Sequence, residues 1–87
     1  MNDIRDTLEE RGTRYGAFCD HAEICQELKD VMHDTPNWES LRPDQKEALE
    51  MIQHKIARIL NGDPDYVDSW TDIAGYSTLV VDRLGVE

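Results

Sequence analysis

The chain lacks long apolar runs, glycine-rich loops and clustered nucleophiles. No segment approaches the roughly 20 apolar residues that a membrane-spanning helix needs, and the first residues lack a basic segment followed by an apolar one. No glycine-rich phosphate loop is present, and no serine, cysteine or histidine arrangement would activate a nucleophile, which excludes two common kinds of catalytic site. We therefore expect a protein that is neither secreted nor bound to a membrane.

Cysteine is also scarce, with Cys19 and Cys25 as the two in the chain. They lie six residues apart in a segment with a helical pattern, so they point to different faces and cannot form a disulfide within that helix. Two free thiols predict a reducing compartment, the cytoplasm.

Basic side chains are few: 9 lysines and arginines face 19 acidic residues, which gives a formal net charge of −10. This charge repels phosphate backbones and anionic lipid, so nonspecific nucleic-acid binding is not expected. A bound metal cation, a basic protein partner and a role in which the acidic surface imitates a polyanion are all compatible with this charge.

The length and the apolar content limit the architecture. A chain of 87 residues with 39% apolar side chains forms one folded core. Small helical domains often gain stability when copies pair their apolar faces, so a homo-oligomer is the expected state.

What the chain does contain is helical periodicity. We predict a short first helix from an Asp3 cap to Gly12, a loop up to Gly16, and longer helices over about 17–33, 43–60 and 64–84. Asp63 is expected to cap the last helix, with Pro64 as its first residue. The predicted fold is a single all-α domain over residues 1–87, a compact bundle of three long helices and a short N-terminal one.

The last predicted helix carries Asp68 and Asp72 one turn apart, so their carboxylates share one face. Clustered carboxylate oxygens are the ligands that Mg²⁺ prefers. In projection this face also carries Tyr76 and Leu79, which favours contact with a pocket or another subunit over a face turned only toward water.

Lys55 and Arg58 lie near the end of the preceding helix. If the short connection makes the two helices antiparallel neighbours, these cations face Asp68 and Asp72. Two interpretations stay open. The four residues tie two helices together as ion pairs, or the cations hold a phosphate while the acids hold its metal ion.

Other candidate residues give weaker signals. Glu47 and Glu50 have a Glu-x-x-Glu spacing that is common on solvated helix faces, and either would supply a further metal ligand. His21 falls on the apolar side of its helix, where a hydrogen-bonded core residue is expected, and His54 falls on the outer side of its own. Cys19 and His21 point to opposite sides of one helix and cannot share a zinc ion.

Three segments resemble an uncharacterised family of small proteins encoded by bacteriophages and prophages: Arg14-Tyr15-Gly16 with Phe18, residues 55–59 and residues 68–76. The last segment also resembles, more distantly, the acidic helix of the all-α nucleoside triphosphate pyrophosphatases of the MazG type. Those enzymes bind Mg²⁺ through carboxylates and release pyrophosphate from nucleotides. Asp68 and Asp72 match acids of that helix, whereas Ser69 stands where a further acid would be. The resemblance thus implies an enzyme or a nucleotide-binding relative without activity.

The leading prediction is therefore a protein of the bacterial cytoplasm that binds a nucleotide with Mg²⁺ and, if active, hydrolyses it. The expected roles are Asp68 and Asp72 on the metal, Glu47 or Glu50 as a catalytic carboxylate, Lys55 and Arg58 on phosphate, and Tyr15 or Trp70 stacked on a base. The rival prediction is a noncatalytic acidic protein that binds a basic host protein, with the face from Asp68 to Tyr76 purely structural.

Overall fold

The computed structural model describes residues 3–85, and these residues form helices and turns without any strand. The elements are α1 (Ile4–Tyr15), α2 (Phe18–His33), the short 3₁₀ helix η1 (Trp38–Ser40), α3 (Pro43–Asn61) and α4 (Val67–Arg83). The all-α prediction is confirmed over this part of the chain. None of these helices combines the length and the apolar character that crossing a bilayer requires.

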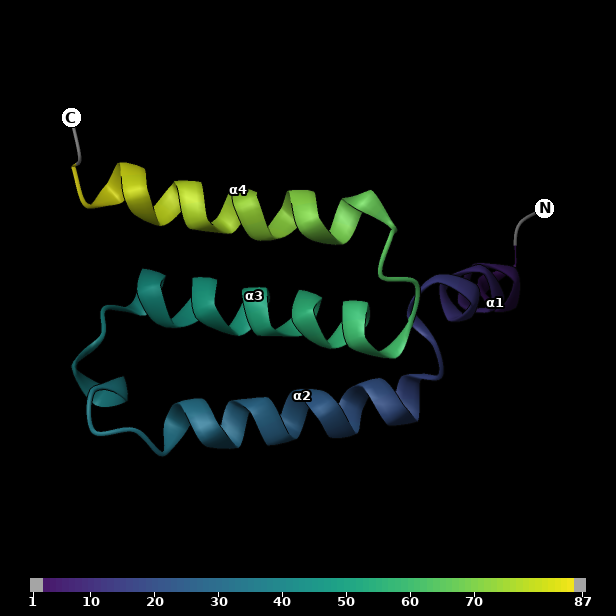
Figure 1. Ribbon diagram of the computed structural model, residues 1–87, viewed down its shortest axis with the longest axis horizontal. Helices are drawn as coiled ribbons and strands as arrows, with labels where there is room; N and C mark the ends of the chain where they lie inside the picture. The colour runs from purple at the N-terminus through teal and green to yellow at the C-terminus, as the bar shows by residue number, and fades with distance from the viewer. Residues whose placement is uncertain (1–2, 86–87) are drawn as a thin grey trace.

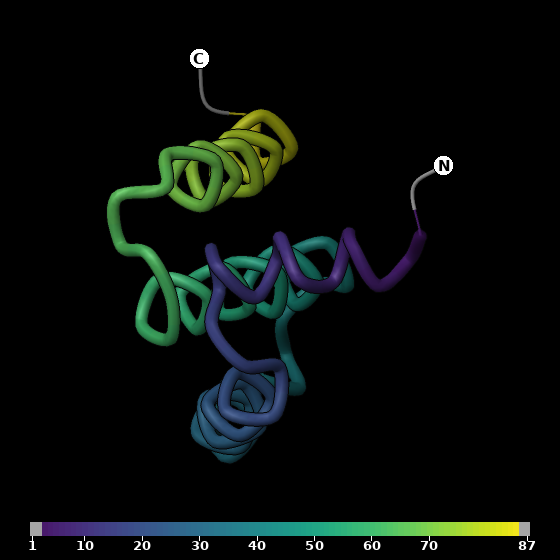
Figure 2. The backbone as a smooth tube through the Cα atoms, turned by 90° about the vertical axis from the view of Figure 1, so that its right-hand side faces the viewer, coloured from purple at the N-terminus to yellow at the C-terminus, as the bar shows by residue number. Residues whose placement is uncertain are grey.

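Three helices lie side by side in a single antiparallel layer, with α3 between α2 and α4 (Figure 1). Seen from the side, the order α4, α3, α2 is unchanged, and α1 runs across the end of the layer beside α3 (Figure 2). Because α3 has a neighbour on each side, it is the helix on which the other elements are assembled.

The first helix is longer than the sequence pattern predicts. Asp3 caps it as expected, accepting a hydrogen bond from the Arg5 amide at 3.3 Å. The helix then continues through Gly12 and ends at Gly16, which has a φ of 81°. The predicted loop between these glycines is wrong, because a glycine inside a helix costs only about 1 kcal/mol. The left-handed backbone that stops the helix lies one turn later.

The end of α1 is fixed to the end of α3 through backbone groups. The Asp63 amide donates to the Arg14 carbonyl at 2.7 Å. The Asn61 side-chain amide donates to the carbonyls of Tyr15 at 2.9 Å and Ala17 at 3.0 Å. These bonds satisfy carbonyls at a helix end that lack helical partners, and they set the position of α1 over α3.

The last helix starts later than predicted, at Val67, with Tyr66 as its N-cap. Asp63 accepts a hydrogen bond from the Asp65 amide at 2.9 Å, so its side chain closes a turn and does not cap the helix. The Trp70 indole donates to the Pro64 carbonyl at 2.8 Å. Pro64 therefore belongs to the connecting turn, and its prediction as the first helical residue is wrong.

The buried core is small and partly polar. Its apolar members are Cys25, Ala48 and Ala57, and its polar members are His21, Gln53, Lys55 and Ser69. The helical spacing of apolar residues predicts burial of Leu49, Ile56 and Leu60 on α3, of Trp70 on α4 and of Leu84 at the C-cap of α4, but all five are exposed. This spacing predicts one buried stripe on α3, but α2 and α4 cover the helix from two sides and bury Gln53 and Lys55, which lie outside that stripe.

Candidate functional site

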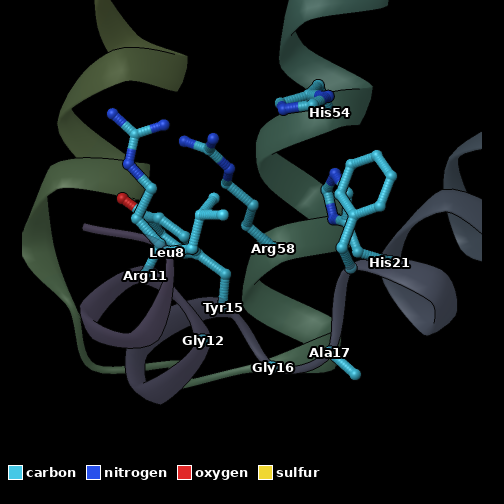
Figure 3. A pocket seen from close by; sticks show the side chains of 10 residues that line it. Leu8, Arg11, Gly12, Tyr15, Gly16, Ala17, His21, His54 and Arg58 are labelled. Carbon is cyan, nitrogen blue, oxygen red and sulfur yellow. The ribbon is translucent and has the colours of Figure 1, made fainter. Parts of the chain in front are cut away.

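A cavity of about 490 Å³ opens where α1, the start of α2 and α3 meet. Its walls combine apolar, aromatic and cationic groups from Leu8, Arg11, Gly12, Tyr15, Gly16, Ala17, Phe18, His21, His54 and Arg58 (Figure 3). The contact between the ends of α1 and α3 holds these walls together. Tyr15 and Arg58, two of the residues predicted to bind ligand, lie in this cavity.

Two arginines line the cavity without a carboxylate partner. Neither Arg11 nor Arg58 forms an ion pair with any residue between 3 and 85, although the chain has about twice as many acids as bases. The Arg58 guanidinium lies 4.1 Å from the centre of the Tyr15 ring. Both arginine side chains extend in the same direction in Figure 3. Unpaired guanidinium groups beside an aromatic face are suited to bind a phosphate or carboxylate.

His21 and His54, two residues of the cavity wall, meet Cys25, which is not part of that wall. The Cys25 Sγ lies 3.3 Å from His21 Nε2 and 3.8 Å from His54 Nδ1. The two imidazole rings are 4.6 Å apart, edge to face. His21 and Cys25 are buried, with 5% and 6% of their surface exposed, and His54 is half-buried.

Burial controls the protonation of these three groups. Burial first, and then the charges of His21 and Arg58, lower the pKa of His54 to about 4. Burial and the Arg58 charge also lower the pKa of His21, which the nearby Ala57 carbonyl only partly opposes. Burial raises the pKa of the Cys25 thiol, against the opposing effects of Lys29, Gln53 and Arg58. Two neutral imidazoles and a thiol therefore meet here at neutral pH.

The lowered pKa of His54 predicts a loss of stability in weak acid. The His54 side chain takes up a proton near pH 6.5 in the unfolded chain but only near pH 4 in the folded chain. The contribution of neutral His54 to stability is therefore complete above pH 6.5 and is lost as the pH falls toward 4. Between pH 7.5 and 5 the free energy of unfolding should fall by about 2 kcal/mol. Urea titrations in chelator-treated buffer would measure it. His54→Gln should remove most of this pH dependence, and an unchanged slope in the variant would contradict the assignment.

The structure brings Lys55 and Asp72 together across the α3–α4 interface, with Nζ and Oδ2 3.0 Å apart. Arg58 does not join them, because its side chain lies in the cavity beside Tyr15. Asp68 accepts a hydrogen bond from the Tyr66 hydroxyl at 2.9 Å, which raises the pKa of Tyr66.

The remaining predicted residues lie apart from one another. Glu50 contacts His33 at 2.8 Å, whereas Glu47 is exposed. Trp70 lies on α4 and is not part of the cavity wall. Within residues 3–85 the three histidine, cysteine, aspartate or glutamate side chains whose ligand atoms converge are His21, Cys25 and His54, and neither Asp68 nor Asp72 is among them.

The histidine and cysteine cluster was not predicted from the sequence. One signal for it was available, since His21 and Cys25 are four residues apart and so share a face of α2. His54 was assigned to the outer side of its helix, but α2 covers that side. Only the packing of α2 on α3 brings the third group into place.

Comparison with known protein families gives a match that covers most of the chain. A family described as a domain of unknown function (DUF6378) matches residues 2–83. No curated protein and no solved structure shows a significant match to the chain.

Proposed function

The chain belongs to the DUF6378 family, and because the description of that family names no activity, we propose from the site itself that the cavity binds a nucleotide or a related phosphate ester. The observation that carries the proposal is the pair Arg11 and Arg58, both without a carboxylate partner in residues 3–85 of a strongly acidic chain. An anion between them would relieve their mutual repulsion and form charge-assisted hydrogen bonds.

The rest of the cavity fits the organic part of such a ligand. A volume of about 490 Å³ falls within the range of about 300–1,000 Å³ that small-molecule sites occupy. The rings of Tyr15 and Phe18 line it and provide flat apolar surface for a base or another planar group. The local cation pair also explains how a protein of net charge −10 would attract an anion to one place.

A matched set of arginine variants tests this proposal. In isothermal titration calorimetry with nucleoside mono-, di- and triphosphates and their nucleosides, affinity should require phosphate. Arg58→Gln should weaken binding about 10- to 100-fold, the loss expected for one hydrogen bond to a charged group, and Arg11→Gln should weaken it less because Arg11 is exposed. Arg5→Gln is the control, since Arg5 is also exposed on α1 but is not part of the cavity wall.

Two results would contradict the proposal. One is wild-type protein that binds none of these compounds. The other is an equal loss of affinity in Arg5→Gln and Arg58→Gln, which would point to a general effect of charge and not to the cavity.

The distant resemblance to MazG-type enzymes supports a nucleotide as the ligand and adds a prediction about Mg²⁺, whereas the resemblance to phage and prophage proteins implies an origin and no ligand. In the Mg²⁺-dependent version of the proposal, Asp68 and Asp72 hold the metal ion and Glu47 or Glu50 supplies another carboxylate. Pyrophosphate is then released from the nucleotide. In the structure Asp72 is paired with Lys55 and Glu50 contacts His33, so side chains must rearrange to assemble this site. An assay of magnesium-dependent pyrophosphate release from the same panel of nucleotides measures this hydrolysis directly.

Assembly between copies stays a prediction as well. Several large apolar side chains are exposed in the described chain, among them Leu49, Leu60, Val67, Trp70 and Leu79. Their exposure supports a homo-oligomer that covers part of the helical layer. The rival function, capture of a basic host protein, is supported by the net charge alone.

A further inference from the structure

We propose that His21, Cys25 and His54 form a binding site for a transition-metal ion of the zinc type, with an open coordination position toward the cavity. These three residues differ from those proposed to bind a nucleotide, so metal binding here does not depend on nucleotide binding.

The Cys25 sulfur already lies at nearly the distance from each imidazole nitrogen that a shared metal ion requires. In tetrahedral zinc sites, with Zn–N near 2.0 Å and Zn–S near 2.3 Å, a nitrogen and a sulfur ligand lie about 3.6 Å apart. The two nitrogen to sulfur distances here are 3.3 Å and 3.8 Å. All three ligand atoms lie within 4.8 Å of one another. Small side-chain rotations would therefore bring them around one ion.

Buried polar atoms beside the cluster lack partners. Among residues 3–85, His21 Nδ1 is buried without a hydrogen-bond partner, as are both polar atoms of the Gln53 side chain, which is 3% exposed. Such atoms are costly to bury, so each calls for an explanation. A metal ion on His21 Nε2 would fix the tautomer that carries a proton on Nδ1, and a small shift would let that proton reach the Ala57 carbonyl, which raises the pKa of His21. Gln53 lies near Cys25, where its amide would donate to a metal-bound thiolate.

The ligands stand on rigid supports. His21 and Cys25 lie one turn apart on α2, and His54 lies on α3, the central helix of the layer. A site built across two packed helices is better defined than one built on loops. Since His21 and His54 line the cavity, the remaining coordination position faces it. Three protein ligands with one open position are typical of zinc sites that hold water or a substrate.

The chemistry of the donors selects the metal. Two imidazoles and a thiolate favour Zn²⁺, Co²⁺ or copper over Mg²⁺, which prefers oxygen ligands. Both imidazoles are neutral at pH 7, as ligands must be, and binding would release the thiol proton of Cys25. The charges of Lys29 and Arg58 act against a cation here. The thiolate and an anion in the open position would offset them.

Cobalt titration of chelator-treated protein tests the site with the metal alone. The expected result is one Co²⁺ per chain, with a thiolate charge-transfer band and the strong visible bands of four-coordinate cobalt. Added Zn²⁺ should abolish both. Cys25→Ser should remove the charge-transfer band, and His54→Gln should weaken Co²⁺ binding at least about tenfold. Circular dichroism of the metal-free variants separates loss of the site from loss of the fold, and Cys25→Ala serves if the serine variant does not fold.

The chain supplies a matched control for each ligand type. Cys19 is an exposed free cysteine on the same helix as Cys25, and His33 is an exposed histidine away from the cluster. Cys19→Ser and His33→Gln should keep the full cobalt spectrum. Wild-type protein without a charge-transfer band would overturn the proposal, as would a band that is lost in Cys19→Ser and kept in Cys25→Ser. Because no nucleotide is present, neither result depends on the proposed nucleotide binding.

Discussion

Replacement of Gly62 by alanine is expected to destabilise the fold by about 3 kcal/mol or more. A Cβ atom at this position would overlap the Arg14 carbonyl oxygen and the Tyr15 Cα atom. Both are backbone atoms, so no side-chain rotation relieves the overlap. The ends of α1 and α3 would have to separate, which breaks the Asp63 to Arg14 hydrogen bond. For a domain of this size the melting temperature should fall by roughly 15 °C.

Gly12 offers the matched control within the helix that Gly62 contacts. A Cβ atom at Gly12 meets nothing within 4 Å, and the residue is helical. Gly12→Ala should therefore stabilise the protein by about 0.5–1 kcal/mol. Urea unfolding of both variants, followed by circular dichroism, measures the contrast. If both variants changed the free energy of unfolding by the same amount and in the same direction, the contact between the two helix ends would not hold the fold together.

Where helices occur was predictable from the sequence, because the spacing of apolar residues reports on it directly. Where they end was less predictable when two stop signals compete. Gly12 and Gly16 are both suitable stops for α1, and only the contact of Gly16 with Asn61 makes the second glycine the one that is needed. Pro64 and Val67 compete in the same way, and the turn closed by Asp63 decides for Val67.

Which face of each helix is buried was harder to predict. A sequence pattern gives one stripe, which suits a helix that rests on a single core. In this flat layer α3 has neighbours on both sides, so Lys55 and His54 turn toward different helices although they are adjacent in sequence. No pattern within α3 contains that information. It comes from the order in which the three helices lie side by side.

The same limit applies to the candidate site. Tyr15 and Arg58 were predicted to bind ligand, and they do line one cavity, but from α1 and α3, 43 positions apart in sequence. The histidine and cysteine cluster was missed because its third member comes from another helix. Asp68 and Asp72 share a face of α4 as predicted, yet their partners differ, since one is bonded to Tyr66 and the other to Lys55.

Replacement of Asp72 by asparagine is expected to cost more stability than replacement of its partner Lys55 by methionine. The Lys55 side chain is only 11% exposed, so loss of the carboxylate leaves a buried ammonium group without a counter-charge. The Asp72 side chain is 46% exposed, and water screening limits the loss to about 1–2 kcal/mol. In Lys55→Met the apolar stem stays packed and the freed carboxylate turns to water, so the effect should be smaller. The double variant should recover part of the loss, and a purely additive result would contradict a direct pairing.

Magnesium separates this structural role from the predicted metal site. If Asp72 only ties α4 to α3, Mg²⁺ should shift the melting temperature of wild-type protein and of Asp72→Asn equally. If Asp68 and Asp72 bind the ion, Mg²⁺ should raise the melting temperature of wild-type protein alone, because a ligand stabilises only the state that binds it. Asp68→Asn is the second arm, since this exposed carboxylate contacts Tyr66 and forms no ion pair with a lysine or arginine between residues 3 and 85. It should melt near wild type without Mg²⁺, and it should lose the magnesium response only if the metal site exists.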